Sequence, residues 1–332
     1  MISRRNFMSQ ATLVGMAGAF GAPRPSPAAE PPPEIKRIRL IHRPSLCEAP
    51  NYIAEELLRG EGFAEVQYIR REEGPAVDAL ASGDADISMI FGAPIILRID
   101  SGDPLVFLSG VHVGCAEVIA NEGVRTFRDL KGKRVAITAP RDTFHVFVAS
   151  IAAHVGLKPE TDIQWVIRPN AEWPQLMAEG KIDAVFTGPP QVQELRARKI
   201  GRTIFNLLTD RPWSQYYCCM LVGNKDFVRR YPVATKRAMR AILKAADVCS
   251  REPERVVRFL VDKGYAQRSD YAVDAMKDVA YGKWREYDAA DTVRFYSLRL
   301  HEAGLIRSSP QKILAQGTDW RLLNELKKEL KG

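Results

Sequence analysis

The sequence lacks the long apolar run that a membrane-spanning helix requires. Such a helix needs about 20 consecutive apolar residues, and the weakly apolar run Ala11–Phe20 supplies roughly half of that length. No block of lysine and arginine interleaved with aromatic residues occurs either, although the formal net charge is +8. The cations are scattered among nearly as many carboxylates, and Arg4, Arg5 and Arg24 stand in the N-terminal segment. We therefore expect neither a spanning helix nor nucleic-acid binding.

Residues 1–30 have the composition of an export signal. The pair Arg4-Arg5 precedes Phe7, the apolar run follows, and the small residues Ala17-Gly18-Ala19 and Ala28-Ala29 are suited to cleavage. Paired arginines before a hydrophobic residue resemble a twin-arginine signal. No cysteine stands near these small residues, so a lipid anchor is not expected. The prediction is a protein exported to the periplasm in folded form.

The motifs that usually mark a metal site or a catalytic centre are also absent. The chain has no Cys-x2-Cys or His-x3-His pair, no His-Glu-x-x-His motif and no Ser/His/Asp grouping. Because twin-arginine substrates fold in the reducing cytoplasm, we expect mostly buried free thiols, and no metal, cofactor or catalysis. The more specific alternative is that the cysteines bind a metal. The cysteines are Cys47, Cys115, Cys218, Cys219 and Cys249.

Strands and helices alternate along the rest of the chain, which predicts an α/β fold with parallel pairing. In the first half, strands are expected at 35–41, 66–69 and 85–91, with helices at 51–58 and 75–81. In the second half, strands are expected at 134–138, 163–167 and 182–186, with helices at 143–155 and 173–178. The segments Ala81–Ile87 and Ala178–Ala184 share a glycine turn and an acidic residue before a buried strand. Two related lobes follow from this repetition.

Two longer apolar stretches, Val106–Ala120 and Tyr216–Val222, are expected to cross from one lobe to the other. From Lys225 onward the chain is predicted to be helical and to cover one lobe. The expected helices are bounded by Pro, Gly, Ser or Asp, and they are Pro232–Ser250, Pro253–Lys263, Tyr271–Ala280, Ala289–Ala303 and Trp320–Leu330.

At several places the sequence resembles the periplasmic binding proteins of importers for nitrate, taurine, aliphatic sulfonates and pyrimidine precursors of thiamine. The resemblance rests on Tyr52-Ile53-Ala54 through Gly62-Phe63, Ala79–Asp86, Leu130–Ala136 and Gly180–Ala184. It implies a type II periplasmic-binding-protein fold, with two lobes and a cleft between them. Lobe 1 would comprise residues 34–115 and 220–332, with the helical C-terminal tail, and lobe 2 residues 116–219. The implied function is capture of a small solute by a monomer and its delivery to an ABC permease and ATPase.

The cleft of such a fold lies beyond the carboxyl ends of the strands, where loops and helix N-termini present backbone N–H groups. Four loops meet this description: Arg43–Asn51, Gly92–Ile95, Ala139–Phe144 and Thr187–Gln191. The predicted ligand-binding residues are Arg43, Ser45, Cys47, Glu48, Gly92, Ala93, Pro94, Arg141, Asp142, Thr143, Phe144, Thr187, Gly188, Pro189 and Tyr217.

Each of these residues also has a purely structural interpretation. Arg141, beside a helix N-terminus, would favour an anion, whereas Asp142-Thr143 is equally suited to cap that helix. Arg43 or Glu48 would fix a charged group, or simply lie at the surface. Glycines at 92 and 188 allow close approach or only make turns, and Phe144 and Tyr217, like Trp213 and Tyr216, would stack on a ligand or pack in the core.

The ligand expected from these residues is small, and anionic or heteroaromatic. Two other functions stay open. Cys218-Cys219 resembles the cysteine-rich segment of the fungal enzyme that makes the thiamine pyrimidine on this fold, with His42 or His112 as its partner; the export signal argues against that enzyme. The second is a receptor whose loaded form docks on a membrane kinase.

Overall fold

A computed structural model describes residues 30–330 apart from 44, 72–74 and 267–269. The predicted signal peptide therefore lies outside the described residues, save for Glu30. Residues Pro32–Gly332 form one compact unit. Its strands fall into three sheets, two built mainly from the N-terminal part of the chain and one from the middle.

The first group of strands combines a parallel pair with a small antiparallel sheet. Strands β1 (Arg37–Ile41) and β2 (Glu65–Ile69) run parallel, joined through helix α1 (Ala49–Gly60). Strands β3 (Ile87–Phe91), β10 (Tyr217–Asn224) and β4 (Leu105–Val113) form the antiparallel sheet in the order β3-β10-β4. The expected parallel pairing is therefore confirmed for β1 and β2, whereas β3 pairs antiparallel with the late strand β10.

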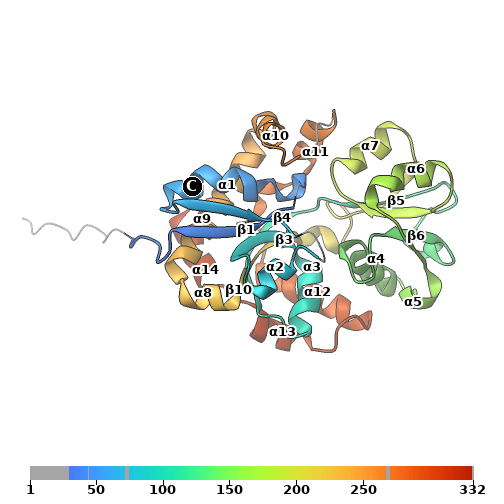
Figure 1. Ribbon diagram of the computed structural model, residues 1–332. Helices are drawn as coiled ribbons and strands as arrows, with labels where there is room; N and C mark the ends of the chain where they lie inside the picture. Colours follow the sequence, from blue (N-terminus) through green and yellow to red (C-terminus); the bar gives the residue numbers. More distant parts are fainter. Residues whose placement is uncertain (1–29, 44, 72–74, 267–269, 331–332) are drawn as a thin grey trace, which may run out of the picture. The chain divides into compact units, whose positions relative to one another are not determined.

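The second group is a five-stranded mixed sheet in the order β7-β6-β8-β5-β9. Strand β6 runs parallel to β7 and β8, while β5 runs antiparallel to β8 and β9. Its elements cluster with α4 to α7 in Figure 1. Their bounds are β5 (Glu117–Ala120), β6 (Arg134–Ile137), α4 (Thr143–His154), α5 (Pro159–Asp162), β7 (Gln164–Ile167), α6 (Trp173–Ala178), β8 (Ala184–Thr187), α7 (Gln191–Ala197) and β9 (Arg202–Asn206).

The expected loop at Gly92–Ile95 is wrong, because these residues open helix α3 (Gly92–Asp100). Glycine and proline in succession suggest a turn, but proline is tolerated in the first turn of a helix, where its missing N–H has no intrahelical partner. Pro94 is the third residue of this helix. A Cβ on Gly92 would lie 3.1 Å from the sulfur of Met220, so α3 packs closely against β10 at this point.

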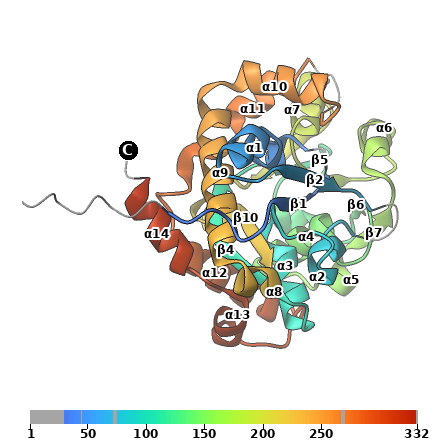
Figure 2. The ribbon, with the colours of Figure 1, turned by 60° about the vertical axis from the view of Figure 1, so that its left-hand side comes forward.

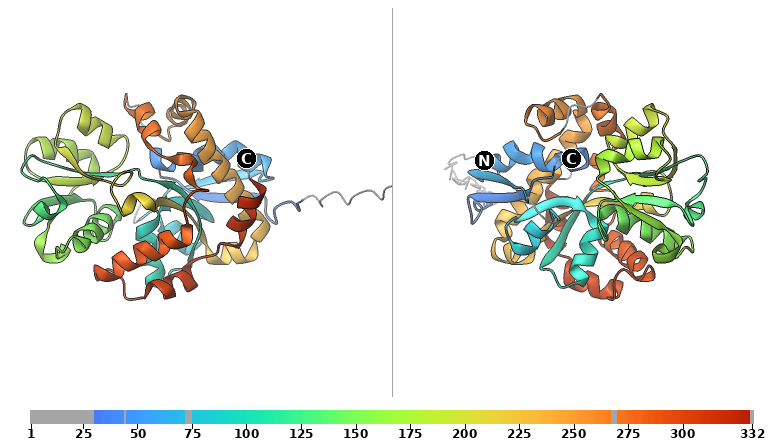
Figure 3. Two further views of the ribbon diagram at one scale, coloured as in Figure 1. Left: turned by 180° about the vertical axis from the view of Figure 1, so that it is seen from behind. Right: turned by 45° about the vertical axis from the view of Figure 1, so that its right-hand side comes forward.

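The C-terminal helices cover the first group of strands. Helix α1 packs against α9, and Figures 2 and 3 show the orange and red helices beside the blue N-terminal strands. Helix α12 also packs against α4, so the tail contacts the second group as well. The bounds are α8 (Lys225–Arg230), α9 (Pro232–Arg251), α10 (Pro253–Asp262), α11 (Ala272–Asp278), α12 (Ala289–Glu302), α13 (Pro310–Gly317) and α14 (Arg321–Glu329), with the short helix α2 at Asp78–Ser82.

One large apolar cluster runs from the N-terminal strands through β4 and β10 into the C-terminal helices. A second, smaller cluster around Trp173, Met177 and Val185 holds α6 on the five-stranded sheet. Within the described part of the chain, none of the helices combines the length and the apolar character needed to span a bilayer.

Candidate functional site

The two groups of strands are joined by two crossing segments. The first crossing segment is β4, then Gly114-Cys115-Ala116, then β5, so the single strand expected over Val106–Ala120 is two strands in different sheets. The second crossing segment is the start of β10. Gly114 has φ +47°, and a Cβ there would lie 2.5 Å from Cα of Leu208. The first crossing segment therefore passes directly against the chain that follows β9.

Four thiol and imidazole side chains meet where the crossing segments run side by side. This His/Cys cluster consists of His112, Cys115, Cys218 and Cys219, whose donor atoms all lie within 4.8 Å of one another. The sulfurs of Cys115 and Cys218 are 3.1 Å apart, and Nδ1 of His112 is 3.4 Å from the Cys218 sulfur. All five cysteines are buried and free, as predicted. Chemically, this group can bind a thiophilic metal.

The loop after β1 brings the buried Glu48, paired with the half-buried Arg43, close to the His/Cys cluster. Nη1 of Arg43 is 3.0 Å from Oε1 of Glu48, and the guanidinium lies 5.7 Å from the ring centre of Phe91. Glu48 is 1% exposed, so its interpretation as a surface side chain is wrong. Burial raises the pKa of Glu48 to about 7, although the positive charge of Arg43 opposes the shift. The preceding Ser45 is half-buried.

We expect the Glu48→Gln variant to lose part of the pH dependence of stability. A carboxyl whose pKa rises from 4.5 to about 7 on folding contributes stability that is present below pH 4.5 and lost as the pH rises through 7. The full effect is about 3 kcal/mol. Between pH 5 and pH 8 the wild type should lose about 2.5 kcal/mol of unfolding free energy that the variant does not lose, because the unfolded carboxyl is already partly ionised at pH 5. Urea unfolding at the two pH values measures this difference. The exposed Glu56→Gln is the matched control, and identical pH profiles for Glu48→Gln and wild type would contradict the assignment.

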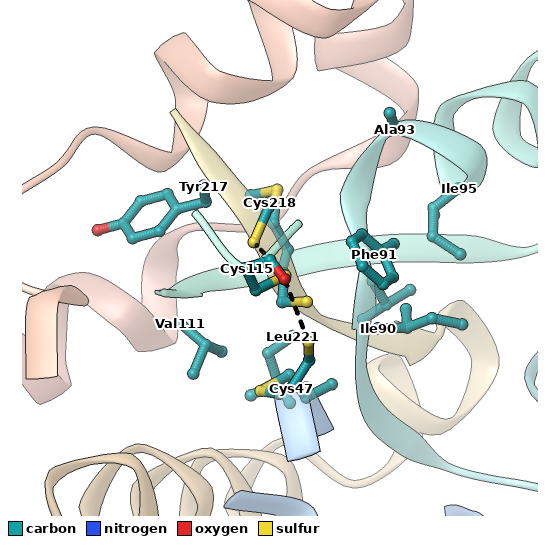
Figure 4. Close-up of a cluster of buried hydrophobic side chains, with 14 of the residues drawn as sticks. Cys47, Ile90, Phe91, Ala93, Ile95, Val111, Cys115, Tyr217, Cys218 and Leu221 are labelled. Carbon is teal, nitrogen blue, oxygen red and sulfur yellow. Dashed lines mark hydrogen bonds between the residues drawn. The ribbon is translucent and has the colours of Figure 1, made fainter. Parts of the chain in front are cut away.

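The loop after β8 meets the loop after β1. A Cβ on Gly188 would lie 3.2 Å from the carbonyl oxygen of Cys115 and 3.6 Å from the sulfur of Cys47. The Cys47 sulfur in turn is 4.0 Å from that same oxygen, and Figure 4 shows Cys115 between Cys47 and Cys218. Thr187 donates its hydroxyl to Oε1 of Gln191 at 2.5 Å. Two of the four predicted loops therefore converge at the crossing segments.

A cavity of about 110 Å³ opens beside this point. Its volume suits a solute of a few heavy atoms, or a few waters at about 30 Å³ each. Residues from the first crossing segment, α7 and α11 line it, among them Cys115, Glu117, Pro189, Arg196 and Asp278.

The buried carboxylate of Glu117 accepts hydrogen bonds from Arg196, from the hydroxyl of Thr203 at 2.6 Å and from the Asn206 amide at 3.0 Å. Gln193 also lines the cavity and donates to Asp278 at 2.9 Å, which links α7 to α11. The sequence analysis missed Glu117, Arg196 and Asp278. The signal for Glu117 was a carboxylate at the start of an otherwise apolar strand.

The predicted loop at Ala139–Phe144 serves the helix that follows it. The Asp142 carboxylate accepts the backbone N–H of His145 at 2.7 Å and of Thr138 at 2.8 Å, so it caps α4 as expected. Arg141, at φ +64°, is exposed and donates to the Leu305 carbonyl at 3.3 Å. Thr143 is the first residue of α4, and Phe144 packs edge-on against Trp173 at 4.8 Å. None of these residues lines the cavity described above.

Tyr217 is held inside the protein by the C-terminal helices. It is 0% exposed, and its hydroxyl donates to the Trp284 carbonyl at 2.8 Å or the Tyr287 carbonyl at 3.0 Å. Ala93 and Pro94, in the first turn of α3, are likewise away from the cavity lining. The structure thus brings together Arg43, Cys47, Glu48, Gly188 and Pro189 from the predicted set, and it places the His/Cys cluster beside them.

Comparison with known proteins agrees with this architecture. Over 100 residues the chain is 29% identical to the bicarbonate-binding protein CmpA of Synechococcus elongatus, a match that covers 30% of this chain and 22% of that protein's length. The periplasmic nitrate-binding protein NrtA of Synechocystis PCC 6803 has a TM-score of 0.72 at 16% identity, covering 90% of each chain. The periplasmic aliphatic sulphonate binding protein SsuA of Escherichia coli has a TM-score of 0.64 at 16% identity, covering 83% of this chain and 90% of that one.

These likenesses confirm the predicted fold, which is that of the periplasmic binding proteins. The matching family model spans residues 44–257, from the loop after β1 through both crossing segments and into α10. The chain therefore belongs to the NMT1-like family.

Proposed function

We propose that this protein is a periplasmic solute-binding protein that delivers a small solute to an ABC importer. The observation that carries the proposal is the small cavity beside the crossing segments, because residues of the first crossing segment, of α7 and of α11 all contribute to it. A solute held there would contact the first crossing segment, strands β5 and β9, helix α7 and the C-terminal helix α11. Its binding would favour one arrangement of the lobes over another, which is how such a protein signals that it is loaded.

The proposal includes the lobe boundaries at residues 115/116 and 219/220, a monomeric chain exported by its twin-arginine signal, and a permease with its ATPase as partners. No reaction is proposed, although a fold of this kind does not by itself decide between binding and catalysis. The solute class we propose is a small anion or a small heteroaromatic molecule. Similarity to bicarbonate- and nitrate-binding proteins supports the anion, as does Arg196, which lines the cavity.

A thermal-shift screen tests this proposal. The panel contains bicarbonate, nitrate, aliphatic sulfonates, aromatic carboxylates and pyrimidines. A solute at about 100 times its Kd should stabilise the protein by about 2.7 kcal/mol and be recovered unchanged after incubation. A compound that is consumed would overturn the binding function in favour of an enzyme.

A variant pair locates the solute in the cavity. Val192 lines the cavity and is buried on α7, so Val192→Phe should fill part of the space and abolish the shift. Leu195, on the same helix, is buried but is not among the lining residues, and Leu195→Met should keep the shift. Loss of binding in both variants, or in neither, would place the solute elsewhere.

A further inference from the structure

The His/Cys cluster has the donor set, the spacing and the surroundings of a metal site. Its members come from distant parts of the sequence: His112 and Cys115 lie on the first crossing segment, Cys218 and Cys219 on the second. We propose that the His/Cys cluster binds one Zn²⁺ ion through its three cysteine sulfurs and Nδ1 of His112. The inference does not depend on which solute the protein carries.

The spacing of the donor atoms suits a tetrahedral ion. With Zn–S bonds of about 2.3 Å and a Zn–N bond of about 2.0 Å, the donors of a tetrahedral site lie roughly 3.5–3.8 Å apart. The observed separations are 3.1 Å between the sulfurs of Cys115 and Cys218 and 3.4 Å from the Cys218 sulfur to Nδ1 of His112. The whole set stays within 4.8 Å. Shifts of less than about 1 Å would complete the tetrahedron.

An irregularity in β10 lets two adjacent cysteines face the same point. In a regular strand, the side chains of successive residues point to opposite faces of the sheet. The pairing of β10 with β4 shifts register between Tyr217 and Cys219 and again between Cys219 and Met220. Such bulges re-aim side chains. Here the result is that the sulfurs of Cys218 and Cys219 both lie in the His/Cys cluster.

His112 is already oriented as a ligand. Its Nε2 is 3.0 Å from the carbonyl oxygen of Cys47, which requires a proton on Nε2. Nδ1 is then the unprotonated ring nitrogen, and it lies 3.4 Å from the Cys218 sulfur and 3.4 Å from the Val113 carbonyl oxygen. A second-sphere hydrogen bond from the far ring nitrogen to a carbonyl is the usual way in which proteins fix a metal-binding histidine. The ring also packs edge-on against Tyr281 at 5.2 Å, which restricts its rotation.

The ligand set selects the metal. Three thiolates and one imidazole favour thiophilic ions, and a four-ligand tetrahedral site with no free position is typical of structural Zn²⁺. Cys115 is 8% exposed and lines the cavity, so an ion can enter from there, while the other three members are 0% exposed. On binding, three S–H bonds are lost, three Zn–S bonds form and the protons go to solvent. No oxidation or reduction is involved.

The proposed ion would tie the two crossing segments together. Its ligands lie on the segments that join the lobes, so a bound ion would fix their relative position, as structural zinc does in small domains. It would act as a structural cross-link where the two groups of strands are joined. This predicts that the ion stabilises the protein against heat whether or not a solute is present.

The test uses the full chain, purified in a reducing buffer and freed of metal with a chelator. We expect it to bind one Zn²⁺ per chain with a Kd of roughly 0.1 µM or lower. Co²⁺ in place of Zn²⁺ should give thiolate charge-transfer bands and the intense visible bands of a tetrahedral site. Cys115→Ser and Cys219→Ser should each weaken Zn²⁺ binding by about 100-fold or more, beyond the 10–100-fold cost of losing an outer-sphere partner.

One matched variant and one folding measurement separate loss of metal binding from loss of the fold. Cys249 is also buried and free, but it lies outside the His/Cys cluster, so Cys249→Ser should retain the affinity and the Co²⁺ spectrum. Circular dichroism of each metal-free variant shows whether it is folded, and the Co²⁺ spectrum of the wild type stands even if one variant is not. The proposal would be overturned by an octahedral Co²⁺ spectrum or by the absence of Zn²⁺ uptake by the fully reduced protein. It would also be overturned if Cys249→Ser lost binding while Cys115→Ser retained it.

Discussion

Replacing Gly114 with alanine is expected to lower the free energy of unfolding by about 3 kcal/mol or more. Two costs add at this position. The backbone has φ +47°, which costs an L-residue about 1–2 kcal/mol. The new Cβ would also lie 2.5 Å from Cα and 2.8 Å from N of Leu208. The segment at Leu208 cannot easily withdraw, because the neighbouring Leu207 N–H donates to the Ala116 carbonyl at 3.1 Å.

A second glycine separates these two costs. Gly132 has φ +73°, but a Cβ there would meet no atom within 4 Å. Gly132→Ala should therefore cost only the backbone term, about 1–2 kcal/mol. The measurement is urea unfolding of both variants beside the wild type. Equal costs for the two variants would mean that the first crossing segment is free to move away from Leu208, and that the close approach is not a constraint.

The strands that the sequence predicted best are those that are buried along their whole length. Strands β3 and β8 are apolar runs ended by clear breakers, and both form close to the expected residues. Strand β9 (Arg202–Asn206) was missed because two of its five residues are exposed at the sheet edge, which leaves no apolar run to find. Strand β9 is held in the sheet by its pairing with β5, and its own sequence does not predict that pairing.

The site was predictable only in part, for a physical reason. Loops at the carboxyl ends of strands can be identified locally, and two of the four, around Cys47 and Gly188, do meet. The His/Cys cluster is different, because Cys115 and Cys218 are 103 residues apart and come together only through the pairing of β4 with β10. The sequence shows two local pairs, His112-x2-Cys115 and Cys218-Cys219, but neither has the Cys-x2-Cys or His-x3-His spacing that the sequence analysis required. The sequence-based expectation that no metal is bound rested on those spacings, and the Zn²⁺ titration now tests it.

The repeated glycine-turn segments, Ala81–Ile87 and Ala178–Ala184, correspond to a repeated contact. In the first lobe, Asp86 accepts the backbone N–H of Arg39 at 2.8 Å and its Nη2 at 2.5 Å. In the second, Asp183 accepts the backbone N–H of Arg134 at 2.8 Å and its Nη2 at 2.8 Å. Each carboxylate thus holds a neighbouring strand, at the middle of β1 and at the start of β6. The two pairs differ mainly in burial, since the Asp86 side chain is 3% exposed and the Asp183 side chain 21%.

This difference makes the pair a test of how burial sets the strength of an ion pair. Asp86→Ala removes the buried partner of Arg39, whose own side chain is 26% exposed, and should cost about 2–3 kcal/mol, because the backbone N–H and guanidinium of Arg39 lose a charged acceptor. Asp183→Ala should cost about 1–2 kcal/mol, since water reaches Arg134 and takes over part of the role.

Urea unfolding measures both costs, and Asp86→Asn separates charge from hydrogen bonding. The amide keeps the size and one acceptor, so Asp86→Asn should recover part of the loss. If instead Asp183→Ala were the more damaging change, the strand start in the second lobe would depend on its carboxylate more than burial implies. The two lobes, although similar in sequence pattern, would then be stabilised by different means. If the predicted order holds, the same short motif contributes more stability in the lobe where its carboxylate is more deeply buried.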